Sequence, residues 1–138
     1  MECLMVFADF PEEANSSLFR VLMPQKYLEK AGHAVPRIHF SQIDWSKIPH
    51  TVLLERAATP EMVEKLRMAG AERIVLTFDD NYGLMSENSP TYYYWKELGN
   101  FLLFRKSLRM VDVSIVPSHF LVGDFRSSGK VEDRKSVV

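Results

Sequence analysis

Two adjacent carboxylates follow a short apolar run near the middle of the chain. Residues 74–78 (Ile-Val-Leu-Thr-Phe) have the length and β-branched composition of a strand buried on both faces, and Asp79 and Asp80 come directly after it. In an open parallel sheet, the ligand crevice lies outside the carboxyl ends of the strands. A carboxylate there binds a substrate hydroxyl or acts as a base toward it. The pair also suits a plain turn, which aspartate caps well, so both interpretations stay open.

Further polar side chains are expected beside the same crevice. Arg56 follows the third predicted strand, and Ser118 and His119 follow the fifth. Three of these side chains have two interpretations each. Arg56 is expected either to contact a ligand or to form a salt bridge, and Arg20 to face either the crevice or solvent. His119 is expected either to contact a ligand or to lie exposed in a first helical turn. The candidate binding residues are Asn15, Ser16, Ser17, Arg20, Arg56, Ser118 and His119. Two neighbouring carboxylates supply too few ligands for a metal, so no metal site is predicted.

The elements that must position these residues follow from hydrophobic patterning. Apolar runs predict five strands, at residues 3–8, 35–40, 51–54, 74–78 and 111–116. Helical spacing and caps predict helices between them, at residues 18–31, 59–69, 90–110 and 118–125. This alternation predicts an α/β fold, a doubly wound parallel sheet of about five strands in the order 3-2-1-4-5 with helices on both faces. In that order the segment 9–17 and the two aspartates flank one crevice.

Composition excludes several classes of protein. The chain has 138 residues, of which 46% are apolar, and this favours one packed domain over disorder. Its 17 basic and 18 acidic residues give a net charge of -1, which supports neither a nucleic-acid partner nor an anionic membrane surface. No apolar run approaches the roughly 20 residues of a membrane span. The single cysteine, Cys3, has no disulfide partner within the chain, so a cytoplasmic protein is expected.

Three segments, taken in order, resemble one enzyme family. They are residues 15–35 (NSSLFRVLMPQKYLEKAGHAV), 53–83 (LLERAATPEMVEKLRMAGAERIVLTFDDNYG) and 104–125 (FRKSLRMVDVSIVPSHFLVGDF). Together they are similar to the N-terminal half of group 1 glycosyltransferases, which have the two-Rossmann-domain (GT-B) architecture. The residues at the corresponding positions are Arg20, Pro24, Leu28, Gly32, His33, Arg56, Asp79, Asp80, Arg105, Asp112 and Ser118.

The resemblance implies a function for half of an enzyme. In such enzymes this half holds the acceptor, a sugar or glycan, while a second Rossmann domain holds a nucleotide-diphosphate sugar as donor. It implies that Asp79 and Asp80 serve catalysis and that this domain binds no cofactor. It leaves undecided whether transfer retains or inverts the configuration at the anomeric carbon. We therefore expect sugar transfer to an acceptor hydroxyl only when a donor domain is supplied in cis or trans, and an inactive isolated chain.

The chain also departs from the family pattern. The segment 9–17 contains no glycine, so close approach of its backbone to a phosphate is not supported. The chain ends at Val138, about where the second domain should begin. We therefore expect one Rossmann-like domain at residues 1–126, with residues 127–138 a mobile tail or the start of a missing linker.

The sequence leaves two other functions open. One is a noncatalytic doubly wound binding module of the signalling-receiver kind, in which Asp9 and Asp79 supply part of an acidic cluster. Against it, Pro117 and Ser118 stand where a receiver needs a lysine. The other is a hydrolase that uses Asp79 as nucleophile or base, but the sequence offers no evident partner group for it.

Overall fold

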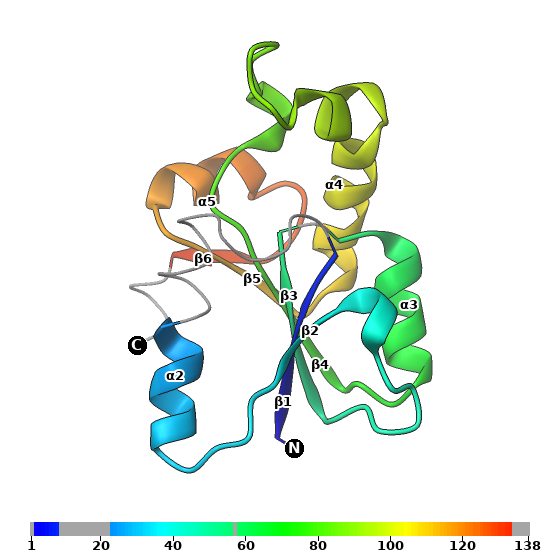
Figure 1. Cartoon of the computed structure of the whole chain (residues 1–138). Helices are drawn as coiled ribbons and strands as arrows, with labels where there is room; N and C mark the ends of the chain where they lie inside the picture. Colours follow the sequence, from blue (N-terminus) through cyan, green and yellow to red (C-terminus); the bar gives the residue numbers. More distant parts are fainter. Residues whose placement is uncertain (1, 9–22, 57, 134–138) are drawn as a thin grey trace.

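Six parallel strands form one sheet in the computed structural model, which describes residues 2–8, 23–56 and 58–133 (Figure 1). The strands are β1 (Cys3–Phe7), β2 (Arg37–His39), β3 (Thr51–Glu55), β4 (Arg73–Thr77), β5 (Val113–Val116) and β6 (Val131–Asp133). They lie in the order β2-β1-β3-β4-β5-β6, and every neighbouring pair is parallel. This arrangement confirms the predicted α/β class with a parallel sheet.

Helices cover both faces of the sheet (Figure 1). The helix α2 (Met23–Lys30) lies on one face, and α3 (Pro60–Met68) and α4 (Asn100–Met110) lie on the other. The short helix α5 (His119–Phe125) joins β5 to β6 and packs against α4 through an aromatic contact between Phe125 and Phe104. Shorter helical turns are η2 (Phe40–Gln42), η3 (Tyr82–Leu84) and the π-helical turn η4 (Tyr93–Glu97).

The strand order differs from the predicted 3-2-1-4-5 in one place. The strand β3 pairs directly with β1, with Leu4 opposite Val52, and β2 lies at the edge of the sheet. The edge position suits β2, because it has only three residues, all half-buried, and follows Pro36, which cannot donate to a ladder. From β1 the chain adds β2 on one side, and it then adds β3 and the later strands on the other side. The direction in which strands are added to the sheet therefore reverses between β1 and β3. The predicted reversal between the first and fourth strands is corrected accordingly.

The larger hydrophobic core lies between the sheet and the helices α3 and α4. Leu4 and Val6 of β1 belong to this core, together with buried residues of both helices. Met5 lies between them in the sequence and packs on the opposite side with Val35 and Leu28 of α2. Because side chains alternate across a strand, the unbroken apolar run of β1 reflects burial on both faces. This agrees with the central position predicted for the strand.

The predicted helix at residues 90–110 is divided into two pieces. The π-helical turn η4 and the helix α4 are separated at Gly99, whose φ of 75° lies in the left-handed region that glycine adopts at little cost. The break gives η4 its own orientation. It buries Trp95 against Tyr82, with the two rings stacked at 4.1 Å.

The segment expected to be a tail contributes to the fold. Residues 131–133 form β6, which pairs with β5, and Val131 is buried. The loop before it lies directly on α4, since a Cβ atom on Gly129 would overlap the carbonyl oxygen of Leu108. The predicted domain end at residue 126 is therefore corrected to include residues up to 133. Residues 134–138 lie outside the described part of the chain.

Candidate functional site at the carboxyl ends of the strands

The point at which the chain reverses across the sheet lies at the carboxyl ends of β1 and β3. Ligands bind outside these ends in open parallel sheets, because neighbouring connections leave on opposite faces and open a crevice there. The strand β1 ends at Phe7 and β3 at Glu55, and these two residues are paired in the ladder. The predicted binding residues Asn15, Ser16, Ser17 and Arg20 follow β1 but lie outside the described residues, as does Asp9.

A buried ion pair between Arg37 of β2 and Glu55 of β3 lies beside these strand ends. Arg37 Nε lies 2.6 Å from Glu55 Oε2, and Arg37 Nη2 lies 3.0 Å from Glu55 Oε1. The Arg37 side chain is 8% exposed and the Glu55 side chain 1%, and the guanidinium lies 4.2 Å above the centre of the Phe7 ring. The pair thus spans β1 from β2 to β3. A bidentate geometry of this kind compensates much of the cost of burying both charges.

Arg56 has an unusual backbone at the end of β3. Its φ is 52°, and its N–H donates to the carbonyl oxygen of Thr77 over 2.7 Å. A left-handed conformation in a residue other than glycine costs about 1–3 kcal/mol, and such residues cluster at binding and active sites. Arg56 lies directly after β3, where the sequence predicted it. Its side chain is buried, and the Glu55 carboxylate beside it accepts a hydrogen bond from Arg37.

Asp79 is held in place by an aromatic side chain from the next turn. Its Oδ1 accepts a hydrogen bond from the Tyr82 hydroxyl over 2.9 Å, and the carboxylate is half-buried. The Tyr82 ring in turn stacks on Trp95 and contacts Phe104 edge-on at 5.5 Å. The core therefore fixes the phenol, and the phenol orients the carboxylate. Sequence reasoning did not single out Tyr82, although its place three residues after Asp79 in a turn was a usable signal.

Asp80 differs from its neighbour. It is exposed, and its Oδ1 accepts a hydrogen bond from the backbone N–H of Asn81 over 2.8 Å. Asn81 also reaches α5, where its Nδ2 donates to Asp124 Oδ2 over 3.3 Å. The turn-capping interpretation therefore applies to Asp80, whereas Asp79 faces the buried phenol.

Ser118 and His119 lie at the start of α5. Ser118 is the residue before the first helical turn, and the His119 ring lies 4.3 Å from that of Phe120. His119 lines a cavity of about 450 Å³ together with Glu132 and Asp133 of β6. The structure thus places both residues beyond the end of β5 as predicted. It groups His119 with β6, however, through the cavity that they share.

The pKa shifts of two other groups have structural causes. Burial disfavours ionisation of Asp112, but hydrogen bonds from the Ile74 backbone N–H and the Arg67 guanidinium hold its pKa below the ordinary value. This carboxylate ties β5 to β4 and α3 at the amino ends of the strands. Burial raises the pKa of the Cys3 thiol, despite a backbone hydrogen bond at Leu53 that acts in the opposite direction. Neither group belongs to the crevice.

Residues 2–8, 23–56 and 58–133 contain no group of three or more histidine, cysteine, aspartate or glutamate side chains placed to hold a metal ion. In the same part of the chain, none of the helices has the length and apolar character needed to span a bilayer.

No family model, curated protein or solved structure matches this chain. The geometry of the site is therefore the basis for assigning a function.

Proposed function

We propose that this chain is the acceptor-binding half of a nucleotide-sugar-dependent glycosyltransferase. The observation that carries the proposal is the placement of Asp79. It follows a buried strand at the carboxyl edge of a parallel sheet, two strands from β1, and a phenol anchored in the core orients its carboxylate. Oriented carboxylates are the groups that bind sugar hydroxyls and accept their protons.

The geometry suggests separate roles for the two aspartates. Asp79 is half-buried and is oriented by the Tyr82 hydroxyl, so it is the carboxylate that binds the acceptor hydroxyl and takes up its proton during transfer. Asp80 is exposed on the same turn and offers a further acceptor to neighbouring hydroxyls of a sugar or glycan.

The donor belongs to another part of the enzyme in this proposal. A second Rossmann-like domain, in cis or in trans, binds the nucleotide-diphosphate sugar and brings its anomeric carbon to the hydroxyl held at Asp79. The new bond to that hydroxyl oxygen replaces the bond to the diphosphate, and the nucleoside diphosphate leaves. The 138-residue chain accordingly binds acceptor without transferring sugar. It needs no cofactor of its own for that task.

Sugar binding by the chain tests the proposal. We would titrate the ¹⁵N-labelled chain with neutral hexoses, N-acetylhexosamines and disaccharides and follow the amide signals of residues 79–82. We expect concentration-dependent shifts there for the acceptor class. Asp79→Asn should abolish them, whereas Glu64→Gln, which changes an exposed carboxylate on α3, should not. Unchanged binding in Asp79→Asn, or shifts confined to other parts of the chain, would count against the proposal.

One observation favours a second candidate, the receiver-like binding module. The order β2-β1-β3-β4-β5 is the flavodoxin-like order, which signalling receivers share. The absence of a lysine after β5, where Pro117 and Ser118 stand, opposes it. Incubation with acetyl phosphate followed by intact-mass measurement separates the two. We expect no stable adduct, and a phosphoryl group on Asp9 or Asp79 would favour the receiver.

A further inference from the structure

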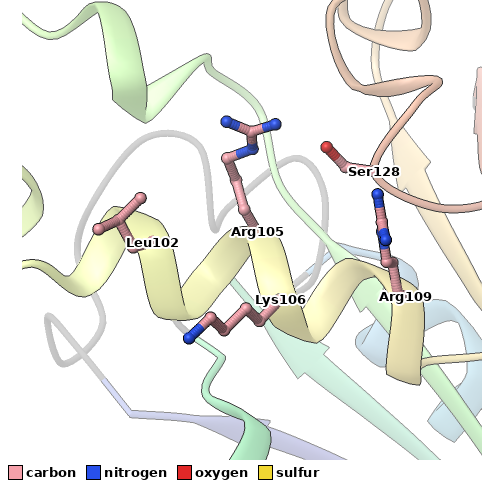
Figure 2. Close-up of a pocket in the computed structure, with 5 residues that line it drawn as sticks. All are labelled: Leu102, Arg105, Lys106, Arg109 and Ser128. Atoms are coloured by element: carbon pink, nitrogen blue, oxygen red, sulfur yellow. The ribbon is translucent and has the colours of Figure 1, made fainter.

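A pocket lined mainly by basic side chains lies on α4, apart from the cavity at His119 (Figure 2). Its lining residues are Leu102, Arg105, Lys106, Arg109 and Ser128, and its volume is about 230 Å³. The helix α4 descends from the carboxyl side of the sheet toward the amino end of β5 (Figure 1). None of its lining residues belongs to the turn that carries Asp79 and Tyr82, so a ligand here is a separate inference from the proposed function.

Two arginines of the pocket share one face of the helix. Arg105 and Arg109 are four residues apart, and Figure 2 shows both side chains extending toward the side on which Ser128 lies, while Lys106 extends away from it. Like charges at this spacing repel each other and disfavour the helix. The last turn of a helix favours a cation, which accounts for Arg109 but not for Arg105.

These cations also differ from others in the protein. Several basic side chains form ion pairs with carboxylates: Arg37 with Glu55, Lys65 with Glu61, Arg67 with Asp112, and Lys130 with Glu132. Across the described ranges, no acidic side chain forms an ion pair with Arg105, Lys106 or Arg109. The pocket thus concentrates positive charge in a protein whose net charge is -1.

The wall opposite the arginines is held by packing. Ser128 is 4% exposed, and its backbone N–H donates to the Phe125 carbonyl oxygen over 2.9 Å. Gly129 comes next and allows the loop to touch the backbone of α4 at Leu108. Arg109 Nη2 also donates to the Ser127 carbonyl oxygen over 3.3 Å. The hydroxyl-bearing wall and Arg109 are therefore positioned before any ligand arrives, which lowers the cost of binding.

The shape and chemistry of the pocket indicate the kind of ligand. Sites for drug-sized molecules usually enclose about 300–1,000 Å³, so this smaller pocket fits a single compact group. Two guanidinium groups and a hydroxyl offer hydrogen-bond donors, and the lining contains no carboxylate to repel an anion. Guanidinium groups match phosphate oxygens bidentately. We propose that the α4 pocket binds a phosphate group, carried by a small solute or by a lipid headgroup.

Titration with inorganic phosphate and pyrophosphate tests the site directly. In ¹⁵N NMR spectra, the amide signals of Arg105, Arg109 and Ser128 should shift together. Arg105→Gln should weaken binding by about tenfold or more, because a charge-assisted hydrogen bond is lost. Arg105→Lys keeps the charge but not the planar fork, and its affinity should fall between those of the wild type and Arg105→Gln.

A matched control separates a site from a general effect of charge. Arg73 is exposed and also lines a cavity, which it shares with Glu72, Asp112 and Glu132. Arg73→Gln removes the same charge and should leave phosphate affinity unchanged. Circular dichroism and thermal melting should show that every variant folds as the wild type does. Equal losses in Arg105→Gln and Arg73→Gln, or shifts away from α4, would overturn the proposal.

Vesicles identify the source of the phosphate. We would compare co-sedimentation with phosphatidylcholine vesicles that contain or lack phosphatidylglycerol. Binding only to the anionic vesicles, weakened by Arg105→Gln and not by Arg73→Gln, assigns a lipid headgroup. Binding of inorganic phosphate or pyrophosphate without vesicle binding assigns a small solute. Failure of both kinds of probe to bind the wild-type chain would refute the site.

Discussion

Glu55 and Asp79 end neighbouring strands at the same edge of the sheet, but their surroundings are opposite. The Glu55 carboxylate is almost fully buried and receives two hydrogen bonds from a cation, Arg37. Asp79 is half-buried and receives its hydrogen bond from a neutral phenol, Tyr82. The first arrangement neutralises a charge that the fold has enclosed. The second orients a carboxylate that the fold has only half enclosed.

Breaking the ion pair should have the largest effect. Glu55→Ala leaves the Arg37 guanidinium buried without its carboxylate, and we expect a loss of about 3–5 kcal/mol of unfolding free energy. Urea denaturation measures it. The double variant Arg37→Met, Glu55→Leu should recover most of that loss, because an apolar pair of similar volume replaces the buried charges. If Glu55→Ala cost no more than Glu64→Ala on the exposed face of α3, Glu55 would not hold the structural role assigned to it.

Removing the Tyr82 hydroxyl should have a smaller effect on stability. Tyr82→Phe keeps the ring stacked on Trp95 but removes the hydrogen bond to Asp79, at a cost of about 1 kcal/mol. Because the carboxylate is then less well oriented, sugar binding should weaken in the NMR titration. Full sugar affinity in this variant would show that the phenol does not position Asp79.

Asp79→Asn should separate stability from function. The amide oxygen still accepts from Tyr82, so we expect less than about 1 kcal/mol of change in unfolding free energy, while sugar binding is lost. Thermal melting and the same NMR titration measure the two quantities on one sample. A large loss of stability would place Asp79 with Glu55 as a structural carboxylate, and the contrast between them would fail.

Asp112, at the amino ends of the strands, should make the unfolding free energy depend on pH. The pKa of Asp112 is lowered in the folded protein, so its contribution to stability is present above the unfolded-state pKa and is lost as pH falls through the folded-state pKa. The difference in stability between the wild type and Asp112→Asn should therefore be constant near neutral pH and shrink in acid. Urea denaturation at a series of pH values measures it. A difference that grew in acid would contradict the lowered pKa.

Local patterns were sufficient for much of the fold. Caps and spacing predicted a helix at residues 59–69, and in the structure Thr59 Oγ1 caps α3 by accepting from the Met62 N–H over 3.3 Å. The run at residues 74–78 predicted a buried strand with aspartates at its carboxyl end. Both predictions succeeded because caps and buried strands depend mainly on nearby residues.

Other features depended on contacts between distant segments. The break at Gly99 places Trp95 over Tyr82, and the helical spacing on either side gave no sign of it. The strand β6 has only three residues, too few for a period to be recognised, and its pairing with β5 stabilises it. The cation pocket on α4 was missed because Ser128 joins it from a segment predicted to be a tail.

The sequence by itself determined the α/β class and the position of Asp79 at the carboxyl edge, because each follows from the hydrophobic period and order of elements along the chain. Only the tertiary structure decided how deeply each carboxylate is buried and which side chain holds it. That choice follows from β3 lying beside β1, which brings Glu55 within reach of Arg37, and from the turn that carries Tyr82 back to Asp79. Burial and partner charge are properties of the assembled sheet, and no single segment contains them.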